Sequence, residues 1–119
     1  MKPRSAKAKG RNFQNKVRQM IIDALGINEL DIKTAVMGES GMDIKLSSSA
    51  RDKFGYAVEC KKVEKINIWK CYEQATENSE DLEPLLIFSK NNSKVLVCFE
   101  FKHLLDLVNQ GNGFRRLTK

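Results

Sequence analysis

An acidic residue and a lysine interrupt the otherwise apolar segment from Tyr56 to Lys61, and this segment constrains the fold more than any other. Apolar residues at successive positions within it, such as Ala57 and Val58, favour a central strand that is covered on both faces. Side chains two residues apart on a strand share a face, so Glu59 and Lys61 point the same way. Burial of this pair without compensation is costly. The pattern therefore indicates a polar site on one face, and the alternative is an ion pair on an exposed sheet.

Asp43 begins a second short apolar segment, after the turn-like residues 38–41. If that segment is a neighbouring strand, Asp43 joins Glu59 and Lys61 in a patch of two carboxylates and one ammonium group. Two carboxylates can hold a hard divalent cation such as Mg²⁺. A nearby lysine can orient a water molecule for attack on a phosphodiester. Together the three residues predict a site for phosphodiester hydrolysis, although Asp43 taken alone would be an ordinary turn aspartate.

Hydrophobic spacing predicts an α/β fold in the order helix, three strands, helix, two strands, helix. In the first helix, Phe13, Val17 and Ile21 recur every four residues, and Gly26 is expected to end it. A polar turn at 91–93 predicts a hairpin. The predicted helices are 12–25, 67–78 and 101–111, and the predicted strands are 31–37, 43–46, 56–61, 85–89 and 94–99.

Positive charge is concentrated at the N-terminus of this 119-residue chain, whose net charge is +6. Residues 1–18 hold seven of the 21 basic residues and no acidic residue, so the remainder is almost neutral. We expect a flexible basic arm at 1–10, followed by a single domain at 11–119. Such an arm attracts a polyanion such as DNA, although it could also be a solvated tail that only aids solubility.

Composition excludes several classes of protein. Three cysteines without a CxxC pair argue against a disulfide framework, and a single histidine argues against a usual zinc finger. No apolar run approaches the length of a membrane span, and the N-terminal charges are not followed by an apolar signal region. The sequence therefore predicts a cytoplasmic protein with no membrane partner, located in the host cytoplasm if a phage encodes it.

The motifs resemble the restriction-endonuclease-like superfamily, also called the PD-(D/E)XK nucleases. The resemblance lies in the string Ser48-Ser49-Ala50-Arg51, in Glu59-Cys60-Lys61 behind a Gly-x-Asp strand, and in Trp69 ahead of Glu73-Gln74-Ala75. It is nearest to small Holliday junction resolvases of archaea and to the short resolvase-like nucleases of phages. It implies an αβββαβ core, with a mixed central sheet flanked by helices, over residues 12–99.

The resemblance also implies a role for each matching residue. Asp43 and Glu59 become metal ligands, with the backbone carbonyl of Cys60 as a third ligand. Lys61 becomes the lysine that positions the attacking water, and Gln74 becomes a helix glutamine that supports the catalytic site. Glu39 is either an additional metal ligand or a solvated turn acid. The expected DNA contacts are Lys7, Lys9, Arg11, Gln14, Arg18, Ser40, Arg51, Lys53 and Lys62.

Two positions depart from the family pattern. Met42 stands where the family usually has a proline, which is dispensable across the superfamily. Gln14 stands where many relatives have a glutamate in the first helix, and a neutral amide weakens the case for a second metal ion.

The function implied by the resemblance is that of a DNA endonuclease that uses Mg²⁺, or Mn²⁺ in its place. The implied substrate is branched DNA, above all a four-way junction, which a homodimer would cut symmetrically. Two alternatives remain: a nuclease of the same chemistry that acts on flaps, single strands or nicked DNA, and a non-catalytic nucleic-acid-binding module.

Overall fold

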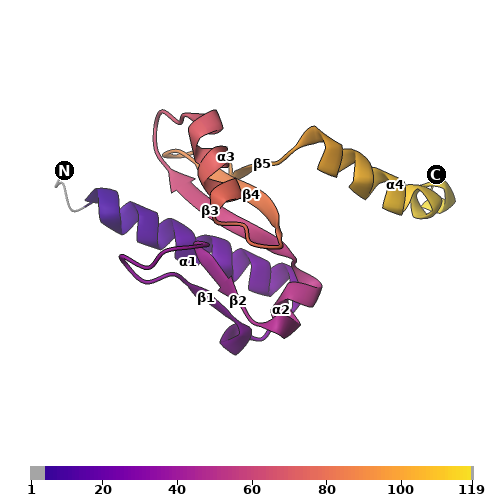
Figure 1. The fold of residues 1–119 in the computed structure, drawn as a ribbon, viewed down its shortest axis with the longest axis horizontal. Coiled ribbons are helices and arrows are strands. Elements are labelled where there is room, and N and C mark those ends of the chain that lie inside the picture. The colour runs from indigo at the N-terminus through magenta and orange to yellow at the C-terminus, as the bar shows by residue number, and fades with distance from the viewer. Residues whose placement is uncertain (1–4, 119) are drawn as a thin grey trace.

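The computed structural model describes residues 5–118, and helices lie on both sides of the strands (Figure 1). In chain order the elements are α1 (Ser5–Leu25), a 3₁₀ helix η1 (Glu29–Asp31), β1 (Ile32–Thr34), β2 (Ile44–Leu46), α2 (Ser48–Lys53), β3 (Tyr56–Lys62), α3 (Ile68–Glu77), β4 (Glu83–Ser89), β5 (Leu96–Cys98) and α4 (Phe101–Thr118). The protein is thus a mixed α/β fold, as the sequence predicts. No helix among the described residues is both long enough and apolar enough to span a membrane.

The strands form a two-stranded sheet beside a three-stranded sheet. Strands β1 and β2 are antiparallel, β3 and β4 are parallel, and β5 runs antiparallel to β4. The two sheets are joined where the backbone N–H of Asp43 donates to the carbonyl of Val58 at 2.9 Å. This bond places the β1–β2 hairpin against β3, on the side of β3 away from β4.

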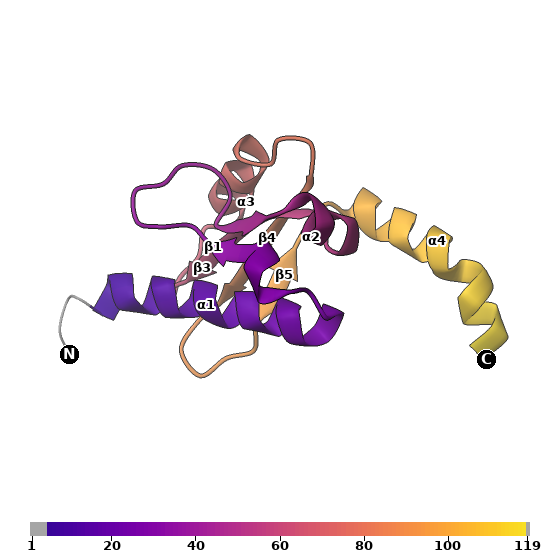
Figure 2. The ribbon, with the colours of Figure 1, turned by 90° about the horizontal axis from the view of Figure 1, so that it is seen from below.

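Apolar side chains alternate between the two faces of β3 and β4, so both faces of the three-stranded sheet are apolar and each is covered by a helix. Val58 and Cys60 on β3, with Leu85 and Ile87 on β4, pack into the main core beneath α1. Residues between them, such as the fully buried Leu86, point to the opposite face, which α3 covers. Figure 2 shows α1 and α3 on opposite sides of the strands. Glu59 and Lys61 therefore lie on the face away from α1.

Side-chain caps and a glycine set the ends of these helices. Ser47 caps α2 and Asn67 caps α3, because each side-chain oxygen accepts a hydrogen bond from a backbone N–H three residues later. Gly26 ends α1 with a φ of 66°, which glycine adopts without steric penalty.

Several predicted boundaries were wrong. The expected arm at 1–10 is helical from Ser5 onward, since residues 6–9 alternate alanine and lysine, both good helix formers; residues 1–4 lie outside the described part. Helix α4 continues past Gly111 to Thr118 because Gly111 does not adopt the positive φ that would end a helix. The first strand covers only 32–34, since residues 36–41 leave the ladder for an exposed turn.

We expect Ile44→Val to lower the free energy of unfolding by about 1 kcal/mol, because it removes one buried methylene. Ile44 is fully buried in the core between the hairpin and α1. Chemical denaturation would measure the change. The matched control is Leu30→Val, because Leu30 is 78% exposed and should tolerate the change. Equal losses in both variants would contradict the packing described here.

Candidate active site

Asp43 is held at the junction of the two sheets by its backbone and by its side chain. Its N–H donates to the carbonyl of Val58, and its own carbonyl accepts from Ala35, each at 2.9 Å. Its Oδ2 accepts a hydrogen bond from the backbone N–H of Cys60 at 2.7 Å. The carboxylate therefore takes the place of a backbone acceptor beside β3 and is fixed next to Glu59.

Glu59 is a buried acid, with 4% of its surface exposed. Burial is the main cause that raises the pKa of its carboxyl to about 7, and the nearby charge of Asp43 raises it further. The positive charge of Lys61 lowers the pKa of Glu59 and partly offsets these two effects. A carboxyl that titrates near neutrality between two charged neighbours is typical of functional sites.

Asp43 has a raised pKa as well, again chiefly through burial. The hydrogen bond from Cys60 and the positive charges of Lys61 and Lys45 partly offset that effect. Among the described residues, no ion pair of 4.0 Å or less joins Lys61 to either carboxylate. Lys61 is thus near both acids while its ammonium group is not committed to a salt bridge with either.

The carbonyl of Cys60 points toward Asp43. The N–H and C=O of one residue in a strand lie on the same edge, and the N–H of Cys60 is bonded to the Asp43 carboxylate. Strand β2 begins only at Ile44, so no described backbone N–H of the hairpin bonds to this carbonyl. This carbonyl oxygen is available to a ligand at the edge of the acidic pair.

These oxygen donors fit a hard divalent cation. Asp43, Glu59 and the Cys60 carbonyl supply the ligand type that Mg²⁺ prefers, and Mg²⁺ commonly binds through one or two carboxylates with water completing the shell. Within residues 5–118 there is no group of three or more His, Cys, Asp or Glu side chains placed to hold a metal. The side chains alone therefore offer two oxygen ligands, and the Cys60 carbonyl adds a backbone oxygen on the same edge of β3.

The Glu39 side chain makes its contacts within and beside the loop that carries it. Its carboxylate accepts a hydrogen bond from the Val36 N–H at 2.9 Å and lies 3.6 Å from the Lys45 ammonium. The Val36 bond is the main cause that lowers the pKa of Glu39. Lys45 also donates to the carbonyl of Ser40 at 2.8 Å. Of the two roles expected for Glu39, the geometry favours an exposed turn acid over a metal ligand.

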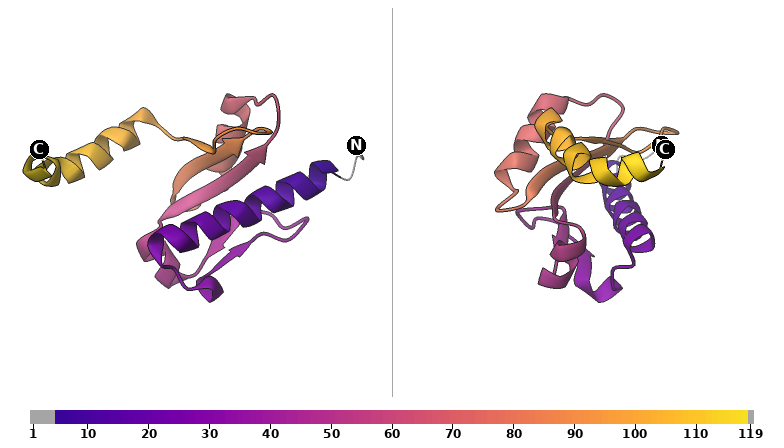
Figure 3. Two further views of the ribbon diagram at one scale, coloured as in Figure 1. Left: turned by 180° about the vertical axis from the view of Figure 1, so that it is seen from behind. Right: turned by 90° about the vertical axis from the view of Figure 1, so that its right-hand side faces the viewer.

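A cavity of about 350 Å³ connects Asp43 to the start of α1. Lys7, Arg11 and Gln14 line its helical side, and the loop at 35–39 lines the other. The structure thus brings three of the predicted DNA contacts to the cavity beside Asp43. In Figure 3 the first turns of α1 lie beside the β1–β2 loop.

Other predicted DNA contacts have partners within the protein. Arg18 was expected to contact DNA, yet its guanidinium donates to the carbonyls of Ile32 and Glu29 at 2.7 and 2.8 Å. These bonds fasten α1 to η1 and β1, and the DNA contact of Arg18 stays a prediction. Arg51 pairs with Glu80 and Asp81 on the loop after α3.

The remaining predicted residues make no described hydrogen bond or ion pair with Asp43 or Glu59. Lys53 lies 3.4 Å from the Gly26 carbonyl, and Lys62 lies over the Phe13 ring at 6.0 Å on the α1 face of β3. Lys9, Ser40 and Gln74 are exposed, and Gln74 makes no described side-chain hydrogen bond.

Sequence reasoning missed Lys45. Its charge lowers the pKa of Asp43, and it braces the 38–41 loop. The signal was available, since Lys45 lies two residues after Asp43 and shares its strand face.

Comparison with known proteins adds no relative: no family model, no curated protein and no solved structure matches this chain.

Proposed function

We propose that this protein is a metal-dependent DNA endonuclease with the restriction-endonuclease-like core. The observation that carries the proposal is the buried Glu59, whose pKa is about 7, next to Asp43 and Lys61. Such a group of charges destabilises the fold unless a cation and a phosphate neutralise it. The hairpin beside β3, the parallel β4 and the helices on both faces agree with the αβββαβ order.

Each residue then has a chemical role. Asp43, Glu59 and the Cys60 carbonyl would hold Mg²⁺ or Mn²⁺, which supplies Lewis-acid polarisation of the phosphate when bound. Lys61 positions the attacking water and offsets the negative charge that develops on the phosphorus oxygens. Attack on phosphorus breaks the bond to the 3′ oxygen and leaves a 5′-phosphate. Lys7 and Arg11, in the adjoining cavity, contact the DNA backbone.

The proposed substrate is branched DNA, above all a four-way junction, and the proposed compartment is the cytoplasm. The test is cleavage of a labelled four-way junction beside matched linear duplex, flap and single-stranded DNA, each with Mg²⁺ and with EDTA. Metal-dependent paired nicks on the junction alone support a resolvase. Equal cutting of the other DNAs would support nuclease activity and contradict the preference for a four-way junction. Binding without cutting of any DNA rejects the nuclease in favour of a binding module.

The double substitution of Lys7 and Arg11 by glutamine is expected to weaken DNA binding in a salt-dependent manner. Each lost phosphate contact reduces the slope of log K against log salt by about 0.9, so the pair should reduce it by about 2. Fluorescence anisotropy over a salt series measures this slope. The control is Lys102→Gln, on the first turn of α4, at the opposite end of the molecule from the start of α1 (Figure 1). An unchanged slope in the double variant would mean that Lys7 and Arg11 do not contact the DNA backbone.

A further inference from the structure

Helix α4 leaves the body of the protein after its first turn. His103 anchors that turn, because its Nε2 lies 2.7 Å from the Tyr56 hydroxyl and its Nδ1 lies 3.8 Å from the Glu83 carboxylate. The His103 ring also packs edge-on against the rings of Tyr56 and Phe99. Beyond this anchor, Figures 1 and 3 show α4 extending away from the sheet without a neighbour.

The projecting helix carries an apolar stripe that nothing in the described chain covers. Phe101, Leu104, Leu105 and Val108 recur at three- and four-residue spacing, and each is between 37% and 72% exposed. The opposite side of the helix carries Asp106 and other polar residues. An amphipathic helix of this kind is stable when its apolar side packs against a second surface.

A complementary surface lies on the same protein. An apolar groove of about 490 Å³ runs between the second half of α1 and the α1-facing side of β4 and β5. Met20, Leu25, Phe54, Ile87 and Val97 are among its lining residues, and Met20 and Val97 are about half exposed. We name this surface the α1–β5 groove.

Exposed apolar side chains gather on these two surfaces. Among the described residues, Met20, Leu25 and Val97 of the groove are between 43% and 52% exposed, and the apolar residues of the α4 stripe are between 37% and 72% exposed. Contiguous exposed apolar surface of this kind marks an interaction site, and a groove and a projecting helix on one chain can cover each other in a pair of copies.

We propose that the α1–β5 groove receives helix α4 of a second copy of this chain, and that the exchange is reciprocal about a two-fold axis. The chain's own α4 extends away from the sheet (Figures 1 and 3), and the His103 contacts fix its first turn. Phe54 at the groove contacts Tyr56, with ring centroids 5.2 Å apart, and Tyr56 contacts His103. The groove and the base of α4 are therefore continuous, as an exchange of helices between two copies requires.

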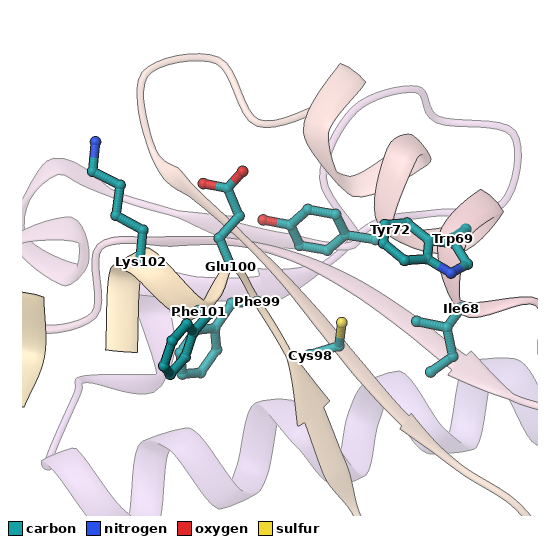
Figure 4. Close-up of a pocket in the computed structure, with 8 residues that line it drawn as sticks. All are labelled: Ile68, Trp69, Tyr72, Cys98, Phe99, Glu100, Phe101 and Lys102. Atoms are coloured by element: carbon teal, nitrogen blue, oxygen red, sulfur yellow. The ribbon is translucent and has the colours of Figure 1, made fainter. Parts of the chain in front are cut away.

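A second apolar hollow, of about 530 Å³, is a poorer acceptor. Figure 4 shows Trp69 and Tyr72 of α3 on one side of it and Phe101 and Lys102 on the other. The first turn of α4 is thus one of its walls. Glu100 and Lys102 also place two charges at its rim, whereas Lys53 is the charged residue lining the α1–β5 groove.

The first test is molar mass by size-exclusion chromatography with light scattering. The full chain is expected at twice 13.6 kDa, and Leu105→Glu and Met20→Glu are each expected to be monomeric. Gln110→Glu adds the same charge to the polar side of α4 and should remain dimeric. Circular dichroism and cooperative thermal unfolding establish that both monomeric variants are folded. A monomeric wild type, or dimers that survive both substitutions, would overturn the proposal.

Mixing the two variants gives the sharper test. Each variant alone damages both helix–groove contacts of a dimer. A mixture of Leu105→Glu and Met20→Glu chains can form a heterodimer in which one intact α4 meets one intact groove. Partial recovery of the dimer on mixing is therefore expected, and failure to recover it would overturn the exchange. Neither result depends on nuclease activity.

Discussion

Lys61→Met is expected to lower the rate of metal-dependent DNA cleavage by about 10³-fold, with little change in DNA affinity. Lys61 lies on the same face of β3 as Glu59, and its charge acts on both carboxylates. Methionine keeps most of the length of the side chain and removes the ammonium group. Charge that develops on the phosphate during attack would then have no lysine to offset it. Single-turnover cleavage of a labelled junction, with anisotropy for binding, separates the two effects.

The neighbouring lysine provides a matched control. Lys62 is the next residue on the same strand, but it lies on the α1 face, over the ring of Phe13. Lys62→Met removes the same charge within one residue of the site, and it should leave the cleavage rate within about threefold of wild type. Equal losses in Lys61→Met and Lys62→Met would mean that general positive charge supports activity, and the role assigned to Lys61 would be wrong.

Elements with a local hydrophobic periodicity could be predicted from the sequence alone. The alternation at Val58, Glu59, Cys60 and Lys61 predicted a central strand with two charges on one face, and β3 has this arrangement. The helix at 12–25 was predicted from the same kind of pattern, although its start was placed seven residues late.

Tertiary contacts could not be predicted in this way. The bond between the Asp43 carboxylate and the Cys60 N–H depends on how the hairpin docks on β3. Arg18 appears in the sequence as one more basic residue, yet carbonyls 11 and 14 residues away engage it. The direction of α4 is set by His103 meeting Tyr56 across 47 residues, a contact that hydrophobic spacing does not encode. Local pattern therefore predicted which strand carries the charges and on which face, while long-range contacts decided which charged side chains have partners within the protein.

Glu59→Gln is expected to stabilise the metal-free protein at pH 8 by about 1 to 3 kcal/mol, even though it should abolish cleavage. The pKa of Glu59 is about 7 in the folded state, compared with 4.5 ordinarily. Between these values the folded chain binds more protons than the unfolded chain, so the free energy of unfolding of the wild type falls as pH rises. Above pH 7 the full cost of the buried charge is present. Glutamine never carries that charge, so the advantage of the variant should shrink as pH falls toward 4.5.

Thermal unfolding at pH 5 and pH 8, with and without Mg²⁺, measures this difference without any assay of activity. A cation bound by the carboxylates stabilises the folded state by mass action, so Mg²⁺ should raise the Tm of the wild type at pH 8 and have little effect on Glu59→Gln. Glu73→Gln, at an exposed position on α3, controls for the general loss of one negative charge. If Glu59→Gln were destabilising at pH 8, Glu59 would not be a strained acid. If Mg²⁺ stabilised the variant as much as the wild type, Glu59 would not be a metal ligand. The strain at Glu59 and its proposed role are thus two consequences of one arrangement, because an acid held at high energy in the free protein gains most when a cation binds.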